Sequence, residues 1–192
     1  GNPWSDMIAK EALRLVGEHM VPAVTDADNL EAREYLMWAA SLAGVAFGQA
    51  GCHLPHGMSY AVSGLVRDFR PEGYPQHQPI VPHGMSVILN APSVFRMTGP
   101  HAPERHLAAY ACLGGTHDAG PAEAGDAVAE QLISMMKATG IPNGLTGVGY
   151  GMDDLDALAD GALPQKRVLD MAPFKVEREH LRAMFEGALT YW

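Results

Sequence analysis

The residues with the clearest capacity for chemistry are two histidines that lie in identical pentapeptides. Pro55-His56-Gly57-Met58-Ser59 returns 27 residues later as Pro82-His83-Gly84-Met85-Ser86. A neutral imidazole is a common ligand of zinc, iron, nickel and copper. Each copy places its imidazole beside glycine, at a break in the chain where a side chain can face a cavity. We therefore interpret His56 and His83 as two ligands of one metal site.

Two further histidines lie close to this pair in the sequence. His53 is three residues before His56 and would share its face of a helix, but Pro55 between them disfavours a regular turn. His77 lies in a Pro- and Gln-rich loop. The ordinary alternative for all four histidines is a structural role, in which the ring satisfies backbone groups at a helix break.

A local motif does not complete the site. Iron sites usually combine imidazole with carboxylate, and a metal needs at least three protein ligands. An aspartate four residues before a histidine would share its helical face, but none of the nine histidines has one. The sequence thus predicts an incomplete site.

The elements that position the pair are helical. Apolar spacing, capping residues and prolines predict helices over 5–20, from 31 to near 51, and over 57–67, 85–97, 103–113, 121–138, 153–159, 164–171 and 177–189. Pro22 is expected to end the first helix and Pro92 to kink the fourth, while Ser5 is a candidate cap of the first. No segment alternates with period two. The predicted fold is all-α, one domain over 1–192 with about eight or nine helices.

A charge-free run crosses the first pentapeptide. From Tyr35 to Val66 there is no Asp, Glu, Lys or Arg. A membrane span is one alternative, but Gly, Ser, Gln and His interrupt the run and its alanines are weakly apolar. We expect instead a central helix enclosed by others on every side.

Composition excludes several classes of function. The net charge of −9 argues against nucleic acid and against an anionic membrane surface, both of which attract Lys and Arg clusters. Only two cysteines are present, so a reducing compartment fits, and the start of the chain has no signal-peptide pattern. We expect a cytoplasmic protein.

Three weaker signals have simpler explanations. The Gly147–Gly151 stretch mimics a phosphate loop, but no strand precedes it and the glycine spacing is wrong, so we expect a turn. His117-Asp118 resembles the doublet of HD-type metal phosphohydrolases but lies between Gly114-Gly115 and Gly120-Pro121, where a loop is expected. Cys52 has no cation nearby in sequence that would favour a thiolate.

Longer strings carry a resemblance to a known family. Asn2-Pro3-Trp4-Ser5-Asp6, residues 43–51, His53-Leu54-Pro55-His56-Gly57, Val81-Pro82-His83-Gly84 and Leu163-Pro164-Gln165-Lys166-Arg167-Val168 follow one another in order. They resemble the C-terminal helical domain of the iron-containing (group III) alcohol dehydrogenases, closest to the hydroxyacid–oxoacid transhydrogenases. The resemblance covers nearly the whole chain.

The resemblance implies roles for individual residues. It places metal-binding imidazoles at His56 and His83, Phe47 on the substrate side, His53 as a pocket neighbour and Tyr60 where many relatives carry a histidine near the nicotinamide. It implies Fe(II) or Zn(II) in a complete site and NAD(P) on a separate dinucleotide domain. The substrate would be a small alcohol or hydroxyacid.

Two parts that the resemblance implies have no match in this chain. The family's Asp and His ligands, four apart on one helix, and its dinucleotide domain lie upstream of the position that matches Asn2. We expect an oxidoreductase half that is inactive alone and self-associates as a homo-oligomer through its exposed apolar face. The alternative is a free-standing, non-catalytic helical binding domain, which an upstream reading frame without a dinucleotide domain would favour.

Overall fold

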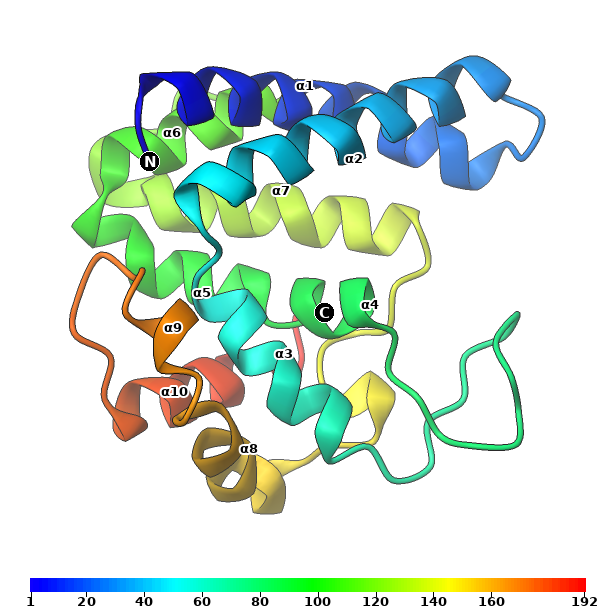
Figure 1. The fold of residues 1–192 in the computed structure, drawn as a ribbon, viewed down its shortest axis with the longest axis vertical. Helices are drawn as coiled ribbons and strands as arrows, with labels where there is room; N and C mark the ends of the chain where they lie inside the picture. Colours follow the sequence, from blue (N-terminus) through cyan, green and yellow to red (C-terminus); the bar gives the residue numbers. More distant parts are fainter. The chain divides into compact units, whose positions relative to one another are not determined.

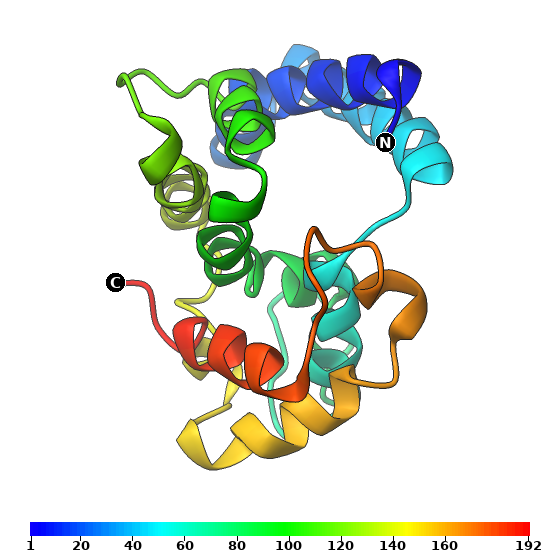
Figure 2. The ribbon, with the colours of Figure 1, turned by 90° about the vertical axis from the view of Figure 1, so that its left-hand side faces the viewer.

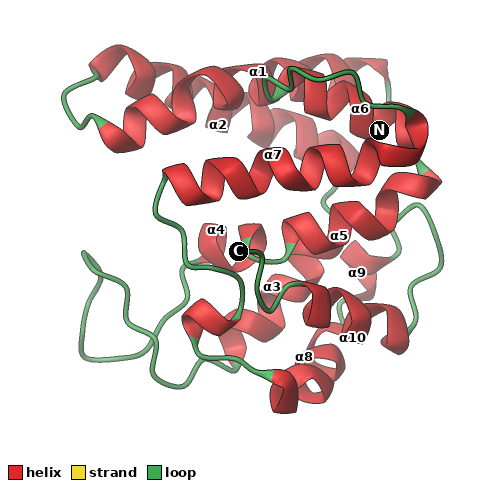
Figure 3. Ribbon diagram, turned by 180° about the vertical axis from the view of Figure 1, so that it is seen from behind, coloured by secondary structure: helices red, strands yellow, loops and turns green.

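The computed structural model describes all residues from Gly1 to Trp192 and contains helices and loops but no strand (Figure 3). The all-α prediction is confirmed. None of the helices combines the length with the hydropathy that a membrane span requires. Ten α-helices form, where about eight or nine were predicted. The helix predicted over 85–97 is divided at Leu89 and Asn90 into two helices, α4 (His83–Ile88) and α5 (Ala91–Thr98). Pro92 is the second residue of α5, where a proline fits because its missing N–H leaves no hydrogen bond of the first turn unmade.

The backbone contacts divide the chain into two compact units, so the prediction of a single domain stays a prediction. We call Gly1–Cys52 with Gly99–Gly140 the hairpin unit, and His53–Thr98 with Ile141–Trp192 the imidazole unit.

The hairpin unit is built on two long helices. Its α-helices are α1 (Pro3–Thr25), α2 (Leu30–Ala50), α6 (Pro103–Cys112) and α7 (Ala124–Ala138). Helices α1 and α2 run side by side as an antiparallel pair (Figures 1 and 2). Helix α6 contacts both α1 and α7.

The start and end of α1 differ from the prediction. Asn2 is the cap: its side chain accepts a hydrogen bond from the Ser5 N–H, while the Ser5 hydroxyl accepts one from the Asn2 N–H. Ser5 is therefore the third residue of a capping box rather than the cap itself. Pro22 does not end the helix, which continues to Thr25, because a proline near the last turn removes only one backbone hydrogen bond. Asn29 caps α2, because its side chain accepts a hydrogen bond from the Ala32 N–H.

The charge-free run is not enclosed on every side. Helix α2 buries only Ala32, Ala39 and Ala46, which recur every seven residues on the side that faces α1. Met37, Trp38 and Phe47 are 71%, 60% and 52% exposed. The predicted central helix is therefore wrong for α2: apolar composition permits burial, but burial also requires neighbouring elements.

The imidazole unit holds six shorter α-helices around a compact core. They are α3 (Leu54–Gly64), α4 (His83–Ile88), α5 (Ala91–Thr98), α8 (Leu155–Ala162), α9 (Lys166–Leu169) and α10 (Arg178–Gly187). Helix α3 contacts α8, α4 and α9, and α10 contacts α8 and α5. Fully buried side chains fill the space between them: Leu54, Met58, Val62, Leu89, Leu155, Leu158, Leu169, Leu181, Met184 and Phe185.

Candidate metal site

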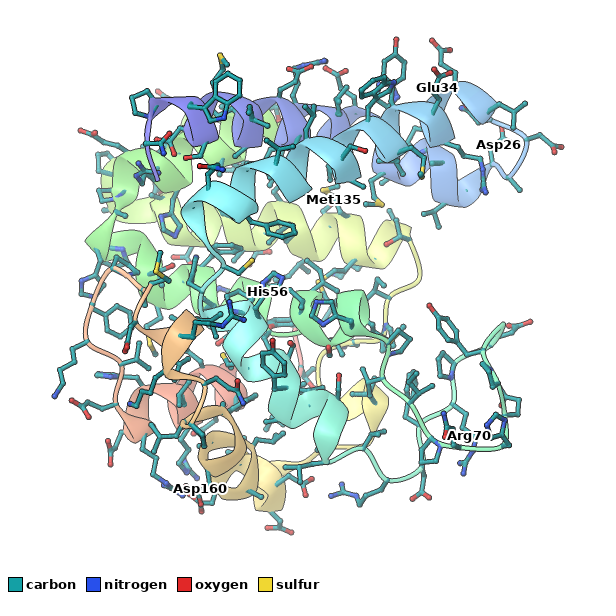
Figure 4. The ribbon with its side chains drawn as sticks, viewed as in Figure 1. Asp26, Glu34, His56, Arg70, Met135 and Asp160 are labelled. Carbon is teal, nitrogen blue, oxygen red and sulfur yellow. The ribbon has the colours of Figure 1, made fainter.

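The two pentapeptides start two helices in the same way. Pro55 lies in the first turn of α3, and Pro82 is the residue before α4. Proline suits these places because it has no N–H to leave unpaired and its φ is already helical. The following imidazoles, His56 and His83, therefore project from helix N-terminal turns, which Figure 4 shows for His56.

The serine of each pentapeptide closes its turn. The Ser59 hydroxyl donates to the His56 carbonyl at 2.7 Å, and the Ser86 hydroxyl donates to the His83 carbonyl at 2.8 Å. Both serines are buried, at 1% and 0% exposure. The same local bond thus fixes the backbone of each histidine. No role was predicted for these two serines, although they repeat together with the histidines.

The glycines of the two pentapeptides meet different surroundings. A Cβ added at Gly57 would lie 2.8 Å from Leu169 Cδ2 and 3.2 Å from Val168 Cγ2, whereas nothing lies within 4 Å of one added at Gly84. Gly57 thus permits a close approach of α3 to α9, which sets the first turn of α3 against the core.

The structure brings the two rings together. The centroids of His56 and His83 are 5.5 Å apart, with an angle of 59° between the ring planes. Two imidazoles on one tetrahedral ion would have centroids about 5 Å apart, because each metal–nitrogen bond is about 2.1 Å and each ring centre lies about 1.1 Å beyond its nitrogen. The separation is therefore compatible with a shared ion.

The surroundings of the pair favour the neutral ring. Burial lowers the pKa of His56, and the charge that His83 carries when protonated lowers it further. Only a deprotonated ring nitrogen offers a lone pair to a metal.

A hydrogen bond between α3 and the segment before α4 fixes the position of His83. The Ser63 hydroxyl donates to the Val81 carbonyl at 3.2 Å. Beside this contact a cavity of about 470 Å³ lies next to His83. It contains no charged side chain; it is lined by Ser59, Tyr60, Ser63, Gly64, Val66, Pro79, Ile80, Val81 and His83. Such a neutral cavity suits an uncharged part of a ligand.

Tyr60 carries the one hydroxyl of the cavity that has no partner within the chain. It is 47% exposed, one turn after His56 on α3, and its hydroxyl forms no hydrogen bond within the chain. The other two hydroxyls of the cavity, on Ser59 and Ser63, already donate to carbonyls.

The remaining predicted site residues lie outside the imidazole pair. His53 precedes α3 and meets Phe95 edge-to-face, with ring centroids 6.3 Å apart. His77 is exposed in the loop between α3 and α4. Phe47 belongs to α2 in the hairpin unit, where it lines an apolar groove with α1. The substrate-side roles of Phe47, His53 and Tyr60 stay predictions.

No three His, Cys, Asp or Glu side chains gather anywhere in the chain in a way that could hold a metal. The described residues thus supply two nitrogen donors for a metal, which is half of a four-ligand site.

The weaker signals have structural explanations. His117 lies in a loop, where its Nδ1 and its backbone N–H both hydrogen-bond to the Tyr110 hydroxyl. The glycine-rich stretch is a turn, formed by a 3₁₀ helix over Thr146–Val148 that ends at Gly149 with a left-handed φ of 93°. Arg67, which was not singled out from the sequence, clamps this turn by bonds to Asp154 and to the Gly149 carbonyl.

Comparisons with known proteins agree with this architecture. The chain is 43% identical over its whole length to "Hydroxyacid-oxoacid transhydrogenase, mitochondrial" of Pongo abelii, of which it covers 41%. It is equally similar to the Xenopus laevis protein of that name, of which it covers 42%. The structure of a 1,3-propanediol oxidoreductase, 26% identical, superposes with a TM-score of 0.85 over 98% of this chain and 46% of that chain. The chain spans about two fifths of the length of the curated relatives it matches.

The match to a family model covers residues 1–189, and its description reads "Fe-containing alcohol dehydrogenase family, C-terminal". The helical architecture and the identity to the transhydrogenases point the same way. The chain therefore belongs to the Fe-containing alcohol dehydrogenase family and corresponds to its C-terminal region.

Proposed function

We propose that this chain is the metal-holding helical half of an iron-dependent, NAD-linked alcohol dehydrogenase or hydroxyacid–oxoacid transhydrogenase. The observation that supports this most is the 5.5 Å separation of the His56 and His83 rings, which two duplicated turns deliver from separate helices. Dinucleotide binding is assigned to polypeptide outside these 192 residues. The proposed location is the cytoplasm.

The chain's own residues would have two tasks. His56 and His83 hold Fe(II) or Zn(II) through ring nitrogens. When bound, the ion would supply Lewis acidity toward the oxygen of a small alcohol or hydroxyacid, and NAD(P) would supply a hydride acceptor. Tyr60 offers its free hydroxyl to an uncharged group in the neighbouring 470 Å³ cavity.

Two ligands imply weak metal binding and little or no catalysis by the isolated chain. A four-ligand structural zinc site contributes about 10–16 kcal/mol, so half of the donors would give about 5–8 kcal/mol. This corresponds to a dissociation constant between about 1 and 200 μM.

Calorimetric titration with Zn(II) near neutral pH tests the proposal. We expect one ion per chain in that affinity range, and loss of the heat signal in both His56→Ala and His83→Ala. His77→Ala is the matched control, because His77 is exposed in a loop and should leave the signal unchanged. Binding that survives either of the first two variants, or no binding at all, contradicts the proposal and favours a non-catalytic helical binding domain.

A further inference from the structure

Helix α4, which carries His83, is short and ends at a buried corner. The last four carbonyls of an α-helix have no partner within it, so most carbonyls of this six-residue helix need one outside the regular helix. The corner that joins α4 to α5 consists of Leu89 and Asn90, and both residues are 0% exposed. Bulk water cannot reach the polar groups of this corner, so other parts of the chain must satisfy them.

Asn90 lies where a helix cap is expected, but its side chain does not cap α5. Its carbonyl accepts a hydrogen bond from the Val94 N–H at 3.1 Å, as the residue before a helix does. A capping side chain accepts from the N–H of the second or third helical residue, and because Pro92 has none, Ser93 is the expected donor. The Asn90 amide instead turns back and donates from Nδ2 to the Ser86 carbonyl of α4 at 2.7 Å. Its Oδ1 is buried and has no hydrogen-bond partner.

The Tyr191 hydroxyl occupies the place of that cap. It accepts a hydrogen bond from the Ser93 N–H at 3.4 Å and donates one to the Leu89 carbonyl at 2.8 Å. One hydroxyl thus satisfies a donor at the start of α5 and a carbonyl just after α4. Burial raises the pKa of Tyr191, so the hydroxyl keeps the proton that it donates.

Tyr191 belongs to the segment after α10, Leu189–Trp192, which is fixed within the imidazole unit. Asn143 Oδ1 accepts a hydrogen bond from the Tyr191 N–H at 2.8 Å. The Thr146 N–H donates to the Leu189 carbonyl at 3.0 Å. These bonds hold the backbone of the segment, so the Tyr191 ring is positioned independently of α4 and α5.

We propose that Asn90 and Tyr191 are positioning residues of His83. Because Tyr191 caps α5, the Asn90 side chain is left to hydrogen-bond to Ser86 of α4. The Ser86 hydroxyl donates to the His83 carbonyl, so two hydrogen bonds join Asn90 to the histidine backbone. The unpartnered Oδ1 costs stability, and the placement of His83 explains why the fold keeps it. The role of His83 as a metal ligand rests on the proposed function, but the placement of its ring can be measured without metal.

Tyr191→Phe tests the proposal. Without the hydroxyl the Ser93 N–H has no acceptor, and we expect Asn90 Oδ1 to turn toward it, away from α4. The new cap restores part of the lost stability, whereas His83 loses its support. Zinc binding should weaken about 10-fold, as for other residues that orient a metal ligand through hydrogen bonds. In the metal-free protein, the NMR cross-relaxation between the ring protons of His56 and His83 should weaken as well.

Tyr110→Phe is the matched control. Tyr110 lies in the hairpin unit, is 5% exposed, and its hydroxyl also forms two hydrogen bonds, both with His117. Its hydroxyl shares no partner with Asn90 or Tyr191, so this variant should change the zinc affinity by less than about two-fold and leave the ring-proton signal unchanged. Asn90→Ala repeats the test if Tyr191→Phe fails to fold. The double variant Asn90→Ala/Tyr191→Phe should bind zinc no more weakly than either single variant, because both residues act through the same hydrogen bonds.

The cross-relaxation between the two histidine rings decides the outcome. The proposal is overturned if this signal is unchanged in Tyr191→Phe and Asn90→Ala, or if it weakens equally in Tyr110→Phe. A parent chain that binds no zinc refutes the metal site of the proposed function. The same signal then still shows whether Asn90 and Tyr191 place His83, so the two failures are distinguishable.

Discussion

The two glycines of the repeated pentapeptide allow a matched test of how α3 is positioned. Gly57→Ala and Gly84→Ala are the same substitution, in the same local sequence, within the first turns of two helices. Either gains up to about 1 kcal/mol of helix propensity. Their surroundings differ, because the new methyl meets Leu169 and Val168 at position 57 and open space at position 84.

The magnitude follows from that difference. At 2.8 Å from Leu169 Cδ2 the new methyl requires a shift, and Leu169 is only 1% exposed, so its side chain has little room to give. Overpacking of this kind costs about 1–3 kcal/mol. Since the propensity gain is shared, we expect Gly57→Ala to be less stable than Gly84→Ala by about 1–3 kcal/mol, with Gly84→Ala as stable as the parent or more so.

Urea denaturation followed by circular dichroism measures both variants. A gap of about 2 kcal/mol corresponds to about 4–8 °C in melting temperature for a chain of this size. Equal free energies of unfolding for the two variants would refute the reasoning, because they would show that α9 does not press on α3 at Gly57.

Three further variants can be tested, two of them by urea denaturation and the third by zinc titration as well. Asp154→Asn should lower the free energy of unfolding by about 1 kcal/mol or less at neutral pH, as for other exposed ion pairs. The hydrogen bond from Arg67 lowers the pKa of Asp154. The contribution of this pair to stability is therefore fully present above pH 4 and is lost as the pH falls through the lowered pKa. Burial raises the pKa of Tyr150 to about 12. The contribution of the neutral Tyr150 to the free energy of unfolding is therefore fully present below pH 10 and is lost between pH 10 and 12. Tyr150→Phe should remove this pH-dependent loss. Tyr150→Phe should also cost about 1–2 kcal/mol at neutral pH, because the Val62 carbonyl loses its 2.6 Å hydrogen bond. Ser63→Ala should weaken zinc binding, because the Ser63 hydroxyl donates to the Val81 carbonyl just before His83. Its loss of stability should be smaller than that of Tyr150→Phe. An unchanged zinc affinity would count against this role of Ser63.

The helical class and the two histidines could be predicted because the signals for both lie within short stretches of the sequence. Capping signals and prolines lie within a few residues of the turns that they set, and the repeated pentapeptide marks both histidines. Their meeting within 5.5 Å depends on contacts such as Ser63 with Val81, which join residues 18 apart and leave no pattern in the sequence.

The errors share a physical origin. The prediction that other helices enclose α2 was wrong. A sequence without charges can be buried, but it does not indicate which neighbouring elements will cover it. Pro22 was expected to end α1, but a proline in the final turns of a long helix costs one hydrogen bond, which the remaining contacts with α2 outweigh. A local sequence signal cannot show whether tertiary contacts will outweigh a lost backbone hydrogen bond.

The convergence of His56 and His83 on a single ion is tested most directly by long-range proton–nitrogen NMR of the histidine rings during a zinc titration. We predict that the ring nitrogens of both residues shift together and saturate at one zinc per chain, while those of His77 stay in place. Shifts of one ring alone, different affinities for the two rings, or an equal response of His77 would contradict a shared ion.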